Sequence, residues 1–155
     1  MSEENLSRVL LEDRIEQLFK AYAPRSPICV WDGGNSDLFN EYILFKNAPF
    51  KGLFRTERRS EFLLHSLRFG DIRIECKYQQ SSGSVDEKFV YMVREARECM
   101  PELEIWFVME GGGWRTEAFQ WLKEECAAER RKTIRVLSLV ETRAQMKRLL
   151  ASVAA

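Results

Sequence analysis

The first part of the chain repeats apolar residues at helical spacing. Ser2, followed by acidic residues, is typical of a helix start, and Pro24 with Pro27 is typical of a helix end. We therefore expect a helix over about 2–22. The apolar positions that share one face of this helix are Leu6, Val9, Leu10, Ile15, Leu18, Phe19 and Tyr22.

Two further segments precede a change of pattern near residue 50. The apolar run Ile28–Trp31 predicts a strand or an extended arm, and the glycine pair in 32–35 predicts a turn. Helical spacing then returns, which predicts a second helix over about 37–47. The positions on its expected buried stripe are Leu38, Tyr42 and Phe45.

From residue 50 onward the pattern first follows strands and then alternates between strands and helices. A period of two predicts three antiparallel strands at about 51–57, 60–67 and 71–79, with a hairpin turn at 69–71. The second half alternates helix and strand, which implies parallel strands joined by crossover helices. The predicted segments are helix 86–99, strand 103–109, a glycine turn at 111–113, helix 115–128, strand 134–139 and helix 141–151.

These elements predict one α/β domain over residues 1–155. Its central sheet is mixed, with an antiparallel meander followed by parallel strands, and helices flank it. The chain is 45% hydrophobic and 31% charged, with a formal net charge of zero, as in an ordinary globular protein. No global basic field points to nucleic acid. Local basic clusters at 55–59 and 130–132 are either solvated loops or binding patches.

The cysteines and the apolar runs bear on where the protein works. Cys29, Cys76, Cys99 and Cys126 are far apart and form no CxxC pair, which argues against a zinc site. No apolar run is long enough to span a bilayer, and the charged first twenty residues do not resemble a signal peptide. We therefore expect a reduced, cytoplasmic protein with no membrane partner.

The strand at 71–79 carries charged residues at alternate positions. Glu75, Lys77 and Gln79 share one face of this strand, and Glu61 lies on the neighbouring strand. Two carboxylates at close range repel unless a cation lies between them, and oxygen ligands suit Mg²⁺ or Mn²⁺. Lys77 could orient water or stabilise charge on a phosphate, and Gln79 could position either group. The alternative is a solvent-facing Glu75–Lys77 pair without a chemical role.

The acidic strand, the Glu75-Cys76-Lys77 motif and the helix that follows resemble the PD-(D/E)XK nuclease superfamily, which includes restriction enzymes and Holliday-junction resolvases. The run from Arg58 to Lys88 is similar to small members carried by phages or mobile elements, and a weaker similarity continues into 106–114. Together these stretches cover about half of the chain. The resemblance implies a restriction-endonuclease-like fold and a metal-dependent nuclease.

The resemblance also implies roles for individual residues. Glu75 matches the second metal-binding acid and Lys77 the catalytic lysine. Glu61 stands where the family usually has aspartate, without the preceding proline, and its longer side chain puts metal geometry and activity in doubt. Asp71 is a rival for this first acid. The family often adds an acid from an earlier helix, for which Glu41 fits and Glu16 fits less well; the alternative for Glu41 is a surface carboxylate.

Several polar residues around the motif are candidates for contact with DNA. Arg58 and Arg59 precede Glu61, Ser82 and Ser84 follow the motif in a polar loop, and Lys88 lies in the next helix. Plain loop or solvated roles are the alternatives. His65, the single histidine, could approach Glu61 by alternation or lie on the surface of the hairpin.

We therefore expect a Mg²⁺- or Mn²⁺-dependent deoxyribonuclease, an endonuclease acting on DNA, in which Glu61, Glu75 and Glu41 hold the metal and Lys77 assists the attacking water. By analogy with small family members, the protein is expected to act as a homodimer. The alternatives are a catalytically weak or inactive nucleic-acid-binding module, or a protein-interaction module on the same fold.

Overall fold

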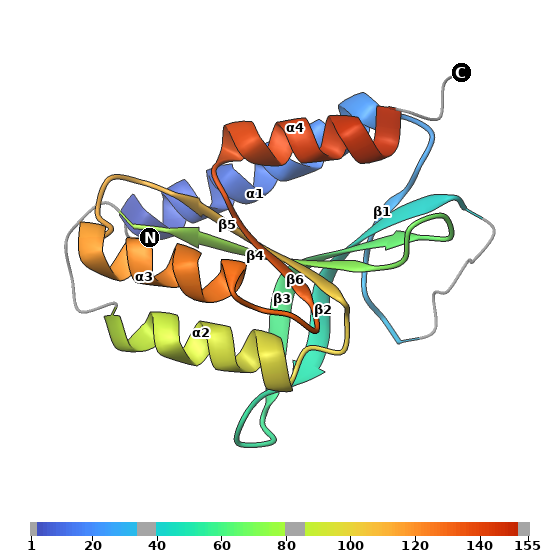
Figure 1. The fold of residues 1–155 in the computed structure, drawn as a ribbon. Coiled ribbons are helices and arrows are strands. Elements are labelled where there is room, and N and C mark those ends of the chain that lie inside the picture. The colour runs from blue at the N-terminus through green and yellow to red at the C-terminus, as the bar shows by residue number, and fades with distance from the viewer. Residues whose placement is uncertain (1–2, 34–39, 80–85, 152–155) are drawn as a thin grey trace.

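The computed structural model describes residues 3–33, 40–79 and 86–151. Within these residues, six strands form one sheet in the order β1-β2-β3-β4-β5-β6, and four helices flank it (Figure 1). The elements in chain order are α1 Glu3–Tyr22, β1 Ile28–Val30, β2 Tyr42–Lys51, β3 Glu57–Ser66, β4 Ile72–Tyr78, α2 Asp86–Glu98, β5 Glu104–Glu110, α3 Thr116–Ala127, β6 Thr133–Leu137 and α4 Leu139–Leu150.

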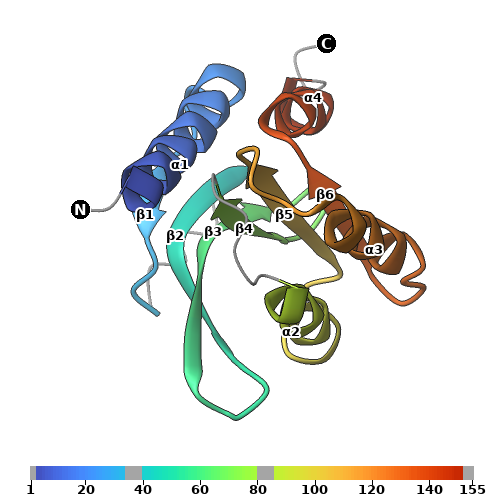
Figure 2. The same cartoon turned by 90° about the vertical axis from the view of Figure 1, so that its left-hand side faces the viewer.

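The sheet is mixed, as the sequence predicts. β3 is antiparallel to both of its neighbours, β2 and β4, whereas β4, β5 and β6 are parallel and β1 pairs with β2 in parallel. α2 connects β4 to β5, and α3 connects β5 to β6. Such crossover connections place helices on the faces of the sheet. α1 and α4 cover one face and α2 and α3 cover the other (Figure 2). This is an α/β restriction-endonuclease-like architecture.

The central strands are buried on both faces and divide their side chains between two cores. Ile74 and Cys76 of β4 pack toward α1 and α4, together with Trp106 of β5. Ile105 and Phe107 of β5 pack on the opposite face toward α2 and α3. Strands that are covered by helices on both faces usually consist of continuous apolar residues. A charged residue on β4 is therefore expected where the helices do not cover the strand completely.

The largest correction to the predicted elements lies in residues 41–57. The helix expected over 37–47 is wrong: β2 spans Tyr42–Lys51, and residues 34–39 lie outside the described part of the chain. The strand expected at 51–57 is also wrong, because this segment connects β2 to β3. There the Gly52 N–H donates to the Thr56 carbonyl at 3.0 Å, and Arg55 has a φ of 61°.

The remaining predicted elements are confirmed to within a few residues at their ends. α4 begins at Leu139, two residues earlier than expected, because Ser138 caps it: the Glu141 N–H donates to Ser138 Oγ at 3.1 Å. Gly70 has a φ of 87° in the hairpin turn before β4, a conformation that favours glycine. In the part of the chain described, no helix is both long enough and apolar enough to cross a bilayer.

Candidate active site

The candidate site lies where β3 and β4 separate. Their ladder pairs residues at three positions, Leu64 with Ile72, Leu63 with Arg73, and Phe62 with Ile74. Beyond Ile74, β4 continues to Tyr78 along β5. The edge of β4 that faces β3 is thereby opened, and Glu61 and Glu75, the next residues along the two strands, lie at the point of separation.

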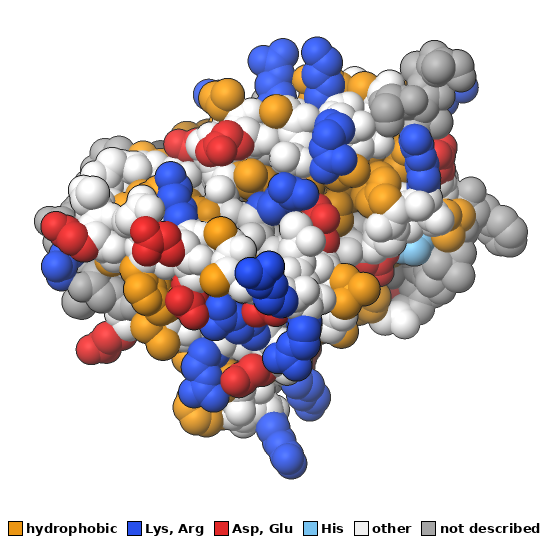
Figure 3. Space-filling view, in the orientation of Figure 1, with side chains coloured by type: hydrophobic (Ala, Val, Ile, Leu, Met, Phe, Trp, Pro, Cys, Tyr) orange, Lys and Arg blue, Asp and Glu red, His pale blue; other side chains and the backbone are white. Residues whose placement is uncertain are grey.

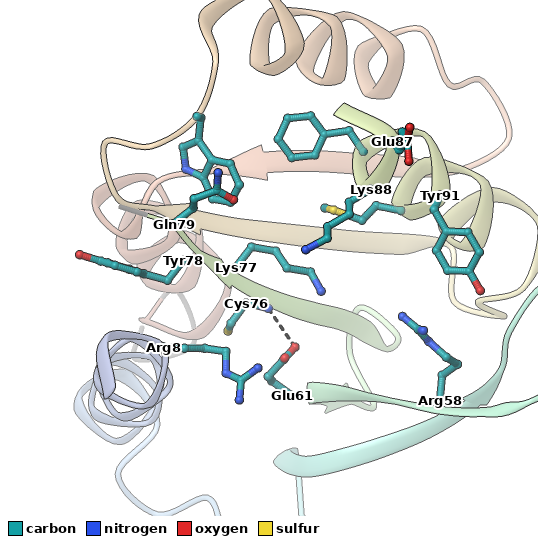
Figure 4. Close-up of a pocket in the computed structure, with 13 residues that line it drawn as sticks. Arg8, Arg58, Glu61, Cys76, Lys77, Tyr78, Gln79, Glu87, Lys88 and Tyr91 are labelled. Atoms are coloured by element: carbon teal, nitrogen blue, oxygen red, sulfur yellow. Dashed lines mark hydrogen bonds between the residues drawn. The ribbon is translucent and has the colours of Figure 1, made fainter. Parts of the chain in front are cut away.

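The Glu61 side chain fills part of this opening. Its Oε2 atom accepts a hydrogen bond from the Cys76 N–H at 3.0 Å (Figure 4). A backbone N–H that has left its ladder still needs an acceptor, and the carboxylate supplies one. The bond holds one oxygen of Glu61 against β4.

Glu75 is buried, with only 6% of its surface exposed. Burial raises the pKa of Glu75 to about 8; the Lys77 ammonium opposes this rise, while the Glu61 carboxylate adds to it by repulsion and by a side-chain hydrogen bond. The raised pKa of Glu75 keeps a proton on this carboxyl at neutral pH in the metal-free protein. A cation between the two groups could take the place of that proton.

A cavity of about 520 Å³ opens beside the carboxyl pair (Figure 4). Lys77 from β4 and Lys88 from α2 extend into it, and Arg8 from α1 and Arg58 from β3 border it. Four cations thus surround a cavity that Glu61 also lines. The other lining residues are Cys76, Tyr78, Gln79, Glu87, Phe89, Tyr91, Met92 and Trp114. A cavity of this size and charge suits an anionic group such as a phosphate.

Gln79 lines the cavity but is bound to the glycine turn after β5. Its Nε2 donates to the Gly113 carbonyl at 3.3 Å, and its own carbonyl accepts from the Gly113 N–H at 2.9 Å. A Cβ at Gly111, whose φ is +98°, would lie 2.0 Å from the Gln79 carbonyl oxygen. The glycine turn is therefore a tight structural contact, as expected, and it fixes the end of β4.

A third acid, Glu12, lies near the site on α1, and the sequence pattern did not single it out. Burial raises the pKa of Glu12, and Glu61 raises it further, whereas Arg8 lowers it. Arg8, Glu12 and Glu16 follow one another at four-residue spacing, so they share one face of α1. This row of charged residues on one face of α1 is the sequence feature that could have identified Glu12 as a candidate. Glu16 itself pairs with Lys46, with an Nζ–Oε1 distance of 3.5 Å.

Three other candidates lie away from the cavity. Glu41 precedes β2, and its carbonyl accepts a hydrogen bond from the Leu67 N–H. Leu67 lies six residues beyond Glu61, which is about 20 Å along extended backbone, so Glu41 is held far from Glu61. The helix expected to carry Glu41 is a strand, so the structure does not bring it to the site. Asp71 instead lies 2.7 Å from His65 Nδ1 at the opposite end of β4.

The remaining candidates are placed as follows. Arg59 lies on the β2–β3 hairpin, where its guanidinium donates to Glu57 at 2.9 Å and to the Asn47 carbonyl at 3.0 Å. Ser82 and Ser84 lie outside the described residues.

The donor atoms at this site are compatible with a hard divalent cation. Glu61 and Glu75 offer carboxylate oxygens at one point, with Glu12 nearby. Among the described residues, no three His, Cys, Asp or Glu side chains form a complete metal cage. Mg²⁺ does not need one, because it is commonly held by one or two carboxylates and keeps several waters.

Comparison with known proteins agrees with this geometry. A family model for the PD-(D/E)XK nuclease superfamily domain matches residues 3–150, from α1 through α4. No curated protein and no solved structure gives a significant match. The family match covers nearly the whole chain and includes both strands that carry the carboxyl pair. The chain therefore belongs to the PD-(D/E)XK nuclease superfamily.

Proposed function

We propose that this protein is a divalent-metal-dependent nuclease that hydrolyses DNA phosphodiester bonds. Membership of the superfamily suggests a nuclease. The observation that carries the finer proposal is the Glu61–Glu75 carboxyl pair, formed where β3 and β4 separate, with Lys77 beside it in a cationic cavity. Glu61 and Glu75 hold Mg²⁺ or Mn²⁺ in this proposal, and Lys77 assists the attacking water.

The residues divide the work of hydrolysis by position. When bound, the divalent ion supplies positive charge that stabilises the charge developing on the scissile phosphate. Glu61 and Glu75 set its position, because both extend from a sheet that is fixed on either side. Lys77 points into the cavity (Figure 4), where its ammonium can hold the attacking water or a phosphate oxygen. Glu12 adds negative charge next to Glu61 and takes the role first considered for Glu41.

The cavity also contains groups that can hold the phosphates of the substrate strand. Lys88 and Arg8 enter it from two helices on opposite faces of the sheet, and Arg58 enters from β3. Phosphate contacts of this kind position a nucleic acid without reading its sequence. Gln79, held by Gly113, keeps its place at the rim and supports the end of β4.

Two further expectations remain part of the proposal. The four cysteines are free thiols, which fits the reducing cytoplasm. A homodimer would let a small domain cover more duplex, and sedimentation of the purified protein with and without DNA measures this directly.

Cleavage assays with a single lysine variant test the central claim. Lys77→Ala should lower kcat by about 10²–10⁴-fold, since it removes a group that acts on the reacting atoms, and should leave the melting temperature near that of the parent. Lys147→Ala, in the last turn of α4, is the matched control. Linear, circular, nicked and four-way DNAs are assayed with Mg²⁺, with Mn²⁺ and with EDTA. Full activity in Lys77→Ala would contradict the proposal.

A nucleic-acid-binding module with little or no activity is the second candidate. It is favoured by Glu61, which stands in place of the usual aspartate and already has one oxygen bonded to the Cys76 N–H. Tight DNA binding without cleavage in either Mg²⁺ or Mn²⁺ would support it. Glu61→Asp then tests whether the longer glutamate side chain limits the activity. If it does, the aspartate variant should cleave DNA faster than the parent protein.

A further inference from the structure

The connection between β2 and β3 projects beyond the helices as an arm, defined here as residues 51–59 (Figures 1 and 2). Its basic side chains are exposed and outnumber its one acid, Glu57, which pairs with Arg59 at 2.9 Å. The basic residues are Lys51, Arg55, Arg58 and Arg59. Lys and Arg side chains gather over the part of the surface where the arm projects below α2 (Figure 3). The arm therefore attracts an anionic polymer.

An aromatic side chain lies near the tip of this basic arm. Phe54 is 78% exposed and stacks against Tyr91 of α2, with ring centroids 6.4 Å apart and planes inclined by 23°. Single exposed apolar residues are common on protein surfaces. Phe54 differs because its ring stacks on a second ring, is otherwise largely exposed, and belongs to an arm that carries four basic residues.

The arm is fixed to α2 by contacts that hold it beside the cavity. Arg58 pairs with Glu95 at 3.2 Å and lies over the Tyr91 ring at 5.4 Å from its centroid. Glu95 is only 2% exposed, and its Oε2 has no hydrogen-bond partner. That oxygen would lie 2.7 Å from a Cβ at Gly52, so glycine permits the close approach of the arm. Burying a carboxylate costs free energy unless it is paired. The ion pair with buried Glu95 therefore holds the Arg58 side chain in place.

The arm and the candidate active site are parts of one surface. Arg58 and Tyr91 line the same cavity as Glu61 and Lys77. In the close-up, Arg58 and Tyr91 lie at the end of the cavity opposite Gln79 (Figure 4). A strand whose phosphate lies against Lys77 can therefore run past Arg58 toward Phe54.

An exposed aromatic ring beside phosphate-binding cations fits one kind of ligand. The bases of a duplex are stacked on one another, so their faces are not available to a side chain. An unpaired base offers a free face, and stacking on an aromatic residue tolerates any sequence. We propose that the arm binds an unpaired nucleotide of the substrate, with its base on Phe54 and its flanking phosphates on Arg55 and Arg58. This inference rests on the proposed function and specifies its substrate as nucleic acid with unpaired nucleotides beside the cleaved bond.

Fluorescence anisotropy in EDTA, where cleavage is suppressed, tests the arm by itself. The probes are a labelled single strand, the same strand with abasic residues, and a blunt duplex. Phe54→Ala should weaken binding of the single strand by about tenfold, the order expected for one lost base stack. The same variant should change binding of the abasic strand and of the duplex by less than about twofold. Arg55→Ala should weaken all three and lower the salt dependence by about one ion.

Control variants separate stacking from general hydrophobic or folding effects. Phe54→Trp should retain the preference for single strands, whereas Phe54→Leu, which keeps the apolar surface but has no π-face, should lose it. Leu103→Ala, at a 72% exposed residue preceding β5, should leave all three affinities unchanged. Equal binding of every probe by Phe54→Ala and the parent protein would overturn the proposal.

The outcomes distinguish this proposal from the proposed function. Cleavage that needs Lys77 but is indifferent to Phe54 on every substrate would overturn the role of the arm and leave the nuclease in place. Binding of single strands that depends on Phe54, with no cleavage of any substrate in Mg²⁺ or Mn²⁺, would support the arm and refute the nuclease.

Discussion

Arg73 and Glu75 are both buried charged side chains of β4, and they point to the same face because they are two residues apart. The two side chains differ in the number of hydrogen-bond and ion-pair partners around them. The Arg73 guanidinium pairs with Glu102 and donates to the carbonyls of Ala48 at 3.0 Å and Pro49 at 3.2 Å. It also donates to Ser60 Oγ at 3.0 Å.

Glu75 meets a group of like charge instead. Burial raises the Glu75 pKa, Lys77 opposes the rise, and Glu61 adds to it by repulsion and by a hydrogen bond; a cavity lies beside the pair. Arg73 lies where β3 and β4 are still paired, at Leu63, whereas Glu75 lies just beyond the last pair. The same strand therefore carries a structural charge with several hydrogen-bond partners and, two residues later, a carboxyl group placed against a second carboxyl group. Strand separation makes the difference.

The largest expected effect comes from removing the Arg73 side chain, which binds Glu102, Ser60 and two backbone carbonyls. Arg73→Met should lower the free energy of unfolding by about 3–5 kcal/mol, because it leaves Glu102 buried without its partner. Urea denaturation measures this loss. Arg94→Ala is the control: it breaks an exposed pair with Glu98 four residues away, which is worth about 0.3–0.5 kcal/mol. Equal losses in the two variants would contradict the structural role of Arg73.

The second effect comes from adding a divalent cation to the carboxyl pair. A divalent ion at 100 times its Kd should stabilise the folded protein by about 2.7 kcal/mol, a rise in Tm of about 5–10 °C. Glu75→Gln should abolish this rise and Glu12→Gln should reduce it. Glu117→Gln, an exposed acid in the first turn of α3, should leave it unchanged.

Melting temperatures measured with EDTA, Mg²⁺ and Mn²⁺ decide the outcome. If no divalent ion changes the Tm, the proposed metal site is refuted and a protein-interaction module on this fold is favoured.

The smallest expected effect, taken over a single pH unit, is the pH dependence of the metal-free protein. The pKa of Glu75 is raised by burial from 4.5 to about 8. Between these values the folded protein binds more protons at this site than the unfolded chain does, so stability falls as pH rises. The contribution is at most about 1.4 kcal/mol per pH unit. Glu75→Gln should flatten this slope in urea denaturations between pH 5 and 8; an unchanged slope would show that another group is responsible.

Local sequence was enough to predict the strands that carry the carboxyl pair. Alternation places Glu75 and Lys77 on one face of β4, and the hairpin turn at Gly70 makes β3 its neighbour. It was not enough for residues 41–51. Tyr42 to Phe45 are all apolar and buried, and a continuous apolar run has no period that separates a strand from a helix. The assignment of Glu41 failed with that helix.

The sequence by itself determined the mixed α/β fold and the strands that carry Glu61, Glu75 and Lys77, because these depend on periods and turns within a few residues. Only the tertiary structure decided that β3 and β4 part at Glu61, that α1 brings Glu12 and Arg8 to the same place, and that Glu95 holds the arm against α2. Each of these depends on contacts between residues far apart in the chain, which the packing of helices on the sheet creates and which no local pattern contains.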